Sequence, residues 1–254
     1  DHVIKNVYIN STGTSIGFFR YTSNATISNF GVTGEIVSKT NSNVKVGGLV
    51  YNADSSKLNN CYSEIEINIE TSGKVSIGGL IYDGYDSKIQ NSYNKGNINV
   101  TADGYVDIGG ITKILDGSEF IGCWNEGNIT ANSNSEIRVG GIASSVYTNL
   151  EKCYNIGDLT AYGKGESDNI QTYIEGITGF LDETISITNC YNEGNIKGGM
   201  LSGGIGTASI GGITGYNRIG KIENCFNRGD VTGSGRSENA TGGITGYLYG
   251  GGTV

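Results

Sequence analysis

The sequence predicts an all-β protein, a right-handed parallel β-helix or β-solenoid of about eight coils with about 31 residues in each coil, forming one domain over residues 1–254. Three observations predict this fold. Short motifs recur at nearly constant spacing. The 254 residues include 43 glycines and no proline, so glycine and asparagine must supply the turns. Runs of Val, Ile, Thr and Tyr alternate with polar residues, and no helical spacing lasts for about ten residues.

The first recurring motif has the pattern Ile-x-Asn-Cys-Tyr-Asn-x-Gly-x-Ile. Some copies match it closely and others loosely, and a remnant stands at residues 4–8. Because the motif combines strand-forming residues with Asn and Gly, it indicates a strand and a turn in each coil. The copies lie at residues 27–36, 58–67, 89–98, 120–129, 150–159, 187–196 and 222–231.

The position of the motif's cysteine accepts residues of modest size that tolerate burial. We therefore expect an interior row of side chains, with free thiols where the residue is cysteine. Adjacent coils would bring neighbouring cysteines within disulfide distance, so inter-coil disulfides stay an alternative. No Cys-x-x-Cys pair indicates a metal site. The row comprises Val7, Phe30, Cys61, Ser92, Cys123, Cys153, Cys190 and Cys225.

The second recurring motif is a β-branched pair followed by two glycines, as at residues 75–80 and 106–111. In most copies about 18 residues separate the cysteine position from the second glycine. Fixed spacing of this kind indicates stacked units that bury their apolar edges only against their neighbours, and parallel crossovers favour the right hand. Later copies contain Ile-Thr-Gly and end at Gly179, Gly215 and Gly246.

The C-terminal copies carry both motifs in regular form. Gly-Gly-Ile-Thr-Gly-Tyr occurs at residues 211–216 and 242–247, and the first is followed by Ile-Glu-Asn-Cys-Phe-Asn-Arg-Gly-Asp-Val at 222–231. This pattern resembles the GLUG repeat of bacterial surface proteins. Repeats of that family accompany adhesin-like proteins and the non-catalytic regions of immunoglobulin A metalloproteases. The resemblance implies a bacterial exterior location and a scaffold role, and it supplies no catalytic residue.

Composition excludes several classes of function. The formal net charge of −8 comes from scattered acidic residues, and without clustered Lys and Arg we expect no nucleic-acid partner. No apolar run approaches the roughly 18 residues of a membrane span. The only histidine is His2, which excludes a His-based zinc site, a Ser-His-Asp triad and a Cys-His dyad, and we expect no cofactor and no metal.

Carboxylates leave one catalytic alternative, a carbohydrate-active β-helix enzyme with two acidic groups at a suitable separation. Acidic residues on an external strand row are more often a solvated face. The residues concerned are Glu126, Asp158, Glu193 and Asp230.

An aromatic residue follows the cysteine position in most copies. If this segment is a straight strand, its side chains alternate between two faces, and the aromatic residues fall on the outer face. There they could bind glycan rings or protein loops. If Asn-x-Gly is instead a corner, the row belongs to the core. From the row we name Trp124, Tyr154 and Tyr191 as candidate binding residues.

Two consecutive coils are longer than the others between the cysteine position and the glycine pair. We expect two neighbouring loops to protrude there, at residues 160–172 and 197–208, and long insertions on a repeat scaffold often carry binding. The second loop consists largely of glycine and other small residues. The first supplies the candidate binding residues Tyr162, Lys164, Glu166 and Asp168.

These observations together predict a non-catalytic extracellular scaffold, a stalk or adhesion module of a bacterial cell-surface or secreted protein. The alternative is a module of a secreted immunoglobulin A protease-like protein that binds a host protein or a glycan. We expect a monomer. Neither end of the chain looks capped, so we also expect flanking repeats or domains.

Overall fold

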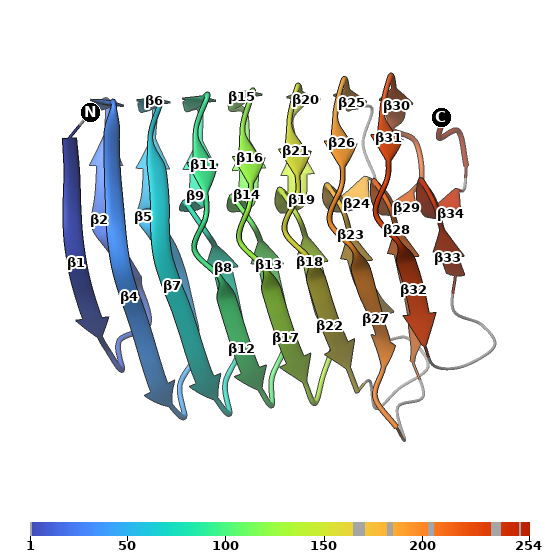
Figure 1. The fold of residues 1–254 in the computed structure, drawn as a ribbon, viewed down its shortest axis with the longest axis horizontal. Coiled ribbons are helices and arrows are strands. Elements are labelled where there is room, and N and C mark those ends of the chain that lie inside the picture. Colours follow the sequence, from blue (N-terminus) through green and yellow to red (C-terminus); the bar gives the residue numbers. More distant parts are fainter. Residues whose placement is uncertain (1, 165–170, 182–184, 203–205, 235–239, 249) are drawn as a thin grey trace.

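The computed structural model describes residues 2–164, 171–181, 185–202, 206–234, 240–248 and 250–254. Within these residues the secondary-structure elements are all β-strands, and the paired strands are parallel. The chain winds through about seven turns with equivalent residues about 31 positions apart. Figure 1 shows the coils side by side along the long axis, from blue at the N-terminus to red at the C-terminus. The predicted β-solenoid is confirmed.

Three sheets run the length of the solenoid, and we call them sheets A, B and C. Sheet A contains β1 (His2–Asn10), β4 (Phe30–Thr40), β7 (Tyr62–Thr71), β11 (Tyr93–Asn94), β12 (Ile98–Ala102), β16 (Trp124–Asn125), β17 (Ile129–Ser133), β21 (Tyr154–Asn155), β22 (Leu159–Gly163), β26 (Tyr191–Asn192), β27 (Ile196–Met200), β31 (Phe226–Asn227) and β32 (Val231–Ser234).

Sheet B contains β2 (Ile16–Ser23), β5 (Val44–Asp54), β8 (Val75–Gly78), β9 (Ile81–Tyr85), β13 (Val106–Gly109), β14 (Thr112–Asp116), β18 (Ile137–Gly140), β19 (Ala143–Tyr147), β23 (Gln171–Glu175), β24 (Thr178–Leu181), β28 (Thr207–Gly211), β29 (Thr214–Asn217), β33 (Ala240–Gly242) and β34 (Thr245–Leu248). Sheet C contains β3 (Thr26–Ser28), β6 (Lys57–Asn59), β10 (Lys88–Gln90), β15 (Glu119–Ile121), β20 (Leu150–Glu151), β25 (Ser186–Thr188) and β30 (Lys221–Glu223).

The pairing register places equivalent residues of successive coils above one another. In sheet A, Ile98 pairs with Ile67 on one side and with Ile129 on the other, and all three side chains are buried. The row continues through Leu159 and Ile196. Similar rows from all three sheets fill the interior with Val, Ile and Leu, so each coil buries its apolar side chains against its neighbours.

Glycine corners explain why long strands in the first coils become pairs of short ones. Strand β7 is continuous and pairs with both β11 and β12, which are separated by a corner at Gly96. In the following coils the corner glycines stack, and a Cβ on Gly127 would overlap the carbonyl oxygen of Gly96. Only glycine fits such a close approach of backbones.

A second turn lies between sheet C and the cysteine position. Asn60, Asn91, Asn189 and Asn224 adopt left-handed backbone conformations there, with φ of 55°, 49°, 55° and 53°. Asparagine tolerates this region better than most residues, which explains the Asn before Cys in the motif.

Candidate functional site

The cysteine position forms an interior row of hydrogen-bonding groups. Cys61, Cys123, Cys153 and Cys190 are fully buried, Cys225 is partly exposed, and all five are free thiols. The predicted interior row is thus confirmed for four of the five cysteines. The backbone N–H of three row members donates to the side chain one coil later: Cys61 N to Ser92 Oγ at 3.1 Å, Cys153 N to Cys190 Sγ at 3.4 Å and Cys190 N to Cys225 Sγ at 3.4 Å. The position therefore suits a small buried group that also accepts a hydrogen bond.

A row of buried asparagines, which sequence reasoning assigned only to a turn, ties the coils of sheet A together. Asn94, Asn125, Asn155 and Asn192 have no exposed surface. Each Nδ2 donates to the Oδ1 of the next asparagine, at 2.9, 2.8, 2.7 and 2.7 Å, and the chain ends at Asn227. Each Nδ2 also donates to a glycine carbonyl two residues later. The recurring Asn-x-Gly was the signal that could have predicted this row.

The aromatic row lies on the outer face, as expected for a straight strand. Asn-x-Gly nevertheless forms a corner, so the expectation that a corner would place the row in the core is wrong. Its members are half-buried, between the buried cysteine and asparagine rows, and Phe226 is 40% exposed. Successive rings stack with centroid separations of 5.0, 4.5, 5.6, 4.7 and 4.9 Å and interplanar angles of 22° or less. The stack comprises Tyr62, Tyr93, Trp124, Tyr154, Tyr191 and Phe226.

The stacking determines which part of each ring a ligand could reach at the candidate residues Trp124, Tyr154 and Tyr191. Each of these rings has a ring on both sides, so its two faces are covered and its edge points outward. A sugar that packs on an aromatic ring needs an open face. The geometry therefore favours stabilisation of the solenoid over recognition at these three positions.

Charged side chains beside the stack pair from coil to coil. Lys95 Nζ lies 3.5 Å from Glu126 Oε2, and Arg228 Nη1 lies 2.9 Å from Glu193 Oε1. The indole Nε1 of Trp124 donates to Glu126 at 2.8 Å. Glu126 and Glu193, which were candidates for a catalytic pair, thus have local partners.

Asp158 and Asp230, the other two acidic candidates, take part in an exposed row of hydrogen bonds to the backbone. The backbone N–H of Asn195 donates to Asp158 Oδ1 at 2.8 Å, and the N–H of Asp230 donates to Asn195 Oδ1 at 3.1 Å. Asp158 therefore holds the adjoining coil as the asparagines of the same row do.

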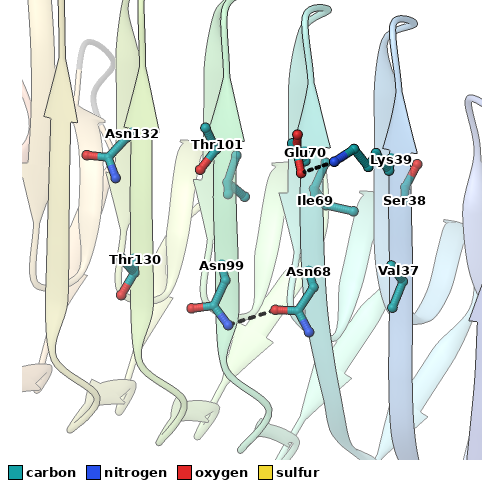
Figure 2. A pocket seen from close by; sticks show the side chains of 11 residues that line it. Val37, Ser38, Lys39, Asn68, Ile69, Glu70, Asn99, Thr101, Thr130 and Asn132 are labelled. Atoms are coloured by element: carbon teal, nitrogen blue, oxygen red, sulfur yellow. Dashed lines mark hydrogen bonds and ion pairs between the residues drawn. The ribbon is translucent and has the colours of Figure 1, made fainter.

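A shallow hollow of about 380 Å³ lies on the outer face of sheet A, over β4, β7, β12 and β17. Figure 2 shows its polar side chains, which come from successive strands. Asn99 Nδ2 donates to Asn68 Oδ1 at 2.9 Å, and Lys39 Nζ lies 2.9 Å from Glu70 Oε2. Amides, hydroxyls and one exposed ion pair therefore line a hollow that is open to solvent.

The structure places Tyr162 in a strand, although we predicted it in a protruding loop. Strand β22 continues through Gly163 because it stays in register with β17, and Tyr162 pairs with Asn132 of the hollow. On its other side Tyr162 pairs with Gly199. Lys164 follows the strand, and its backbone N–H donates to the carbonyl of Ser133 at 2.9 Å. Glu166 and Asp168 lie outside the described residues.

On sheet B, the face opposite the core carries a cluster of buried charges that sequence reasoning missed. Asp107 is 3% exposed, accepts a hydrogen bond from Ser144 and lies 3.5 Å from Lys113 Nζ. Arg138 lies over the rings of Tyr105 and Tyr173, at 5.7 and 5.4 Å from their centroids. Burial raises the pKa of Asp107 above its ordinary value.

Glu175 is the exceptional residue of this face. It pairs with Gly140 and Gly211 in a row that holds glycine in the adjacent coils, yet it is fully buried. Neither carboxylate oxygen has a hydrogen-bond partner within the part of the chain that the structure describes. Burial raises the pKa of Glu175 well above its ordinary value, and Arg138 opposes that rise. Departure from the repeat, here Glu in a glycine row, was the sequence signal that could have identified it.

Two further properties concern the described residues as a group. They contain no cluster of three or more His, Cys, Asp or Glu side chains that could hold a metal ion. They also contain no helix of sufficient length and apolar character to cross a membrane.

Comparison with known proteins identifies the repeat. Residues 206–232 match the family model described as the GLUG motif. A comparison with curated proteins and another with solved structures each gave no match. The matched segment includes a glycine corner, the cysteine position and the aromatic stack, all of which recur in register along the solenoid. Residues 206–232 therefore carry a GLUG motif, and the stacked coils around them repeat its pattern.

Proposed function

We propose that this chain is a non-catalytic, extracellular repeat scaffold, a stiff stalk or interaction module of a bacterial cell-surface or secreted protein. The observation that carries the proposal is the buried asparagine row, in which each coil from Asn94 to Asn227 is bonded to the next by the same pair of amides. The aromatic stack and the cysteine row repeat this coupling at two other positions. A rod tied together at every coil resists bending and separates whatever lies at its two ends.

The chemistry of the exposed residues supports a scaffold more than an enzyme. Glu126 and Glu193 are paired with cations of neighbouring coils, and Asp158 bonds to the backbone of the next coil. Glu175 has no hydrogen-bond partner among the described residues, but it is fully buried, so a substrate cannot reach it in this conformation.

Localisation and activity can be tested together. We expect an antibody against the chain to label intact cells of the source bacterium or to detect the protein in the medium, and external protease to remove the signal. We also expect no cleavage of acidic or neutral polysaccharides. Retention inside intact cells would overturn the extracellular scaffold, and polysaccharide cleavage that depends on Glu126 or Glu193 would replace it with an enzyme.

The second candidate function is glycan binding at the hollow of sheet A, and Tyr162 favours it. Tyr162 is half-buried, and the next strand has Gly199, which has no side chain to cover the ring, at the paired position. Amides of Asn99 and Asn132 on the same face could hydrogen-bond sugar hydroxyls.

A glycan array with three proteins tests this candidate. We expect any glycan bound by the native chain to be lost with Tyr162→Ala and kept with Tyr85→Ala, because Tyr85 is a 52% exposed tyrosine on sheet B. Equal binding by all three proteins would remove the hollow as the site.

A further inference from the structure

Three consecutive coils place thiols in contact along one interior row. The Sγ of Cys190 accepts the N–H of Cys153, and the Sγ of Cys225 accepts the N–H of Cys190, each at 3.4 Å. The Cys190 residue therefore lies between two cysteines of the same row, one in each adjacent coil. The strands that follow are in register, since Tyr191 pairs with Phe226. Cys190 is thus a central thiol with a potential disulfide partner on each side.

The spacing of these coils fits a disulfide bond. Neighbouring parallel strands lie about 4.8 Å apart, which falls inside the Cα separation of about 4.4 to 6.8 Å found for disulfides. The Cβ separation must shorten slightly from the strand spacing, and this requires only a small local tightening of the two corners. No coil has to move to another register.

Accessibility separates the two partners of Cys190. Cys153 and Cys190 have no exposed surface, whereas Cys225 is partly exposed. A small reagent therefore reaches Cys225 first. Burial raises the pKa of Cys123 to about 12, and the pKa values of Cys190 and Cys225 are raised as well, first by the hydrogen bond that each thiol makes to a neighbouring thiol. Exposure, rather than acidity, therefore favours Cys225 as the first thiol to react.

We propose that Cys190 and Cys225 are a redox modification site, which a low-molecular-weight disulfide converts into an inter-coil disulfide bond. Cys225 loses its proton and attacks one sulfur of the reagent, forming a mixed disulfide and releasing one thiolate, which takes up that proton. Cys190 then loses its proton and attacks the sulfur of Cys225, and the second reagent thiol leaves with that proton. Two protein thiols are oxidised and one reagent disulfide is reduced to two thiols.

The disulfide bond would cross-link the two ends of a coil that is longer than the regular repeat. Cys190 and Cys225 are 35 residues apart, whereas equivalent residues of regular coils such as Cys61 and Ser92 are 31 apart. A longer coil leaves more chain to order on folding, and a cross-link removes freedom mainly from the unfolded chain. The disulfide therefore stabilises one of the two coils that are longer than the regular repeat.

Peptide mapping of the full chain tests the proposal. The folded protein is incubated with oxidised glutathione, its remaining thiols are alkylated, and its peptides are identified by mass spectrometry. We expect one disulfide joining the Cys190 and Cys225 peptides, and a rise of about 5 °C or more in Tm that dithiothreitol reverses. Cys225→Ser should abolish both effects, and Cys61→Ser should change neither.

Serine is a suitable replacement because Ser92 already occupies the same row and makes the equivalent hydrogen bond. Cys190→Ser is a second variant that removes the bond from the other side. Three results would overturn the proposal: a Cys153–Cys190 bond, glutathione that remains attached to Cys225, or thiols that all stay free.

Discussion

The buried asparagines of sheet A repeat from coil to coil, whereas the outward row of sheet B changes at almost every coil. In the asparagine row each side-chain amide donates to the equivalent amide of the next coil, so stacking identical coils supplies every partner. The row of sheet B passes through Ser76, Asp107, Arg138 and Tyr173. Its charges depend on individual partners such as Lys113, and the carboxylate of Glu175 beside it has no hydrogen-bond partner among the described residues. A regular row satisfies buried polar groups automatically, and an irregular row does not.

Breaking the regular row should have the largest effect. Asn155→Ala leaves the carbonyl oxygens of Asn192 and Gly157 and one N–H of Asn125 without a buried partner. We expect a loss of about 3 to 5 kcal/mol in the free energy of unfolding, measured by urea denaturation. The matched control is Asn99→Ala, which removes a partly buried Asn–Asn bond on the outer face of the same sheet and should cost less than about 1 kcal/mol. Equal losses would contradict the buried ladder.

Replacing Glu175, the buried acid on the irregular face of sheet B, should have the next largest effect on stability. The pKa of Glu175 is raised in the folded chain, so the stability of the neutral acid is fully present below its unfolded pKa and is lost as pH rises through the folded value. Glu175→Gln removes the ionisation. We expect it to stabilise the chain by about 1 to 3 kcal/mol at pH 8 relative to the native sequence, and by less at pH 5.

Denaturation at the two pH values checks the Glu175 prediction, with Glu126→Gln as the control. Glu126 is paired at the surface with Lys95 and should show no comparable gain at pH 8. A Glu175→Gln effect that is the same at both pH values would contradict ionisation of the buried acid.

Interrupting the aromatic stack should cost less than breaking the amide row. Tyr154→Ser removes ring contacts with Trp124 at 5.6 Å and with Tyr191 at 4.7 Å. We expect a loss of about 1 to 3 kcal/mol in unfolding free energy, and Tyr154→Phe should restore nearly all of it. Tyr147→Ser, at a 48% exposed tyrosine on sheet B, is the control and should stay within about 0.5 kcal/mol.

Removing an exposed ion pair should have the smallest effect. Lys39 and Glu70 are 2.9 Å apart, but their side chains are 76% and 60% exposed. Lys39→Ala should change the unfolding free energy by less than about 0.5 kcal/mol, and salt should reduce even this. A loss above about 1 kcal/mol in urea denaturation would mean that charge pairs on the outer face hold the coils together.

Strand type, repeat length and the interior cysteine row could be predicted before the structure, whereas the interior asparagine row could not. Constant spacing of the cysteine position and the absence of proline sufficed for the solenoid, because stacking equal coils is the way such units bury their apolar edges. The candidate surfaces were less predictable. Tyr162 was assigned to a loop, since nothing in its own neighbourhood reveals that β22 continues in register with β17.

The sequence by itself determined the fold, the period and the residues of each row, because a repeated pattern gives every coil the same local conformational preference. The tertiary structure alone decided which side of the strand the aromatic rings occupy, since that depends on where the chain turns at Gly96 and its equivalents. It also decided that asparagines meet asparagines in the interior and that Glu175 meets no partner. Hydrogen bonds between coils join residues about 31 positions apart, and their geometry exists only once the coils are stacked.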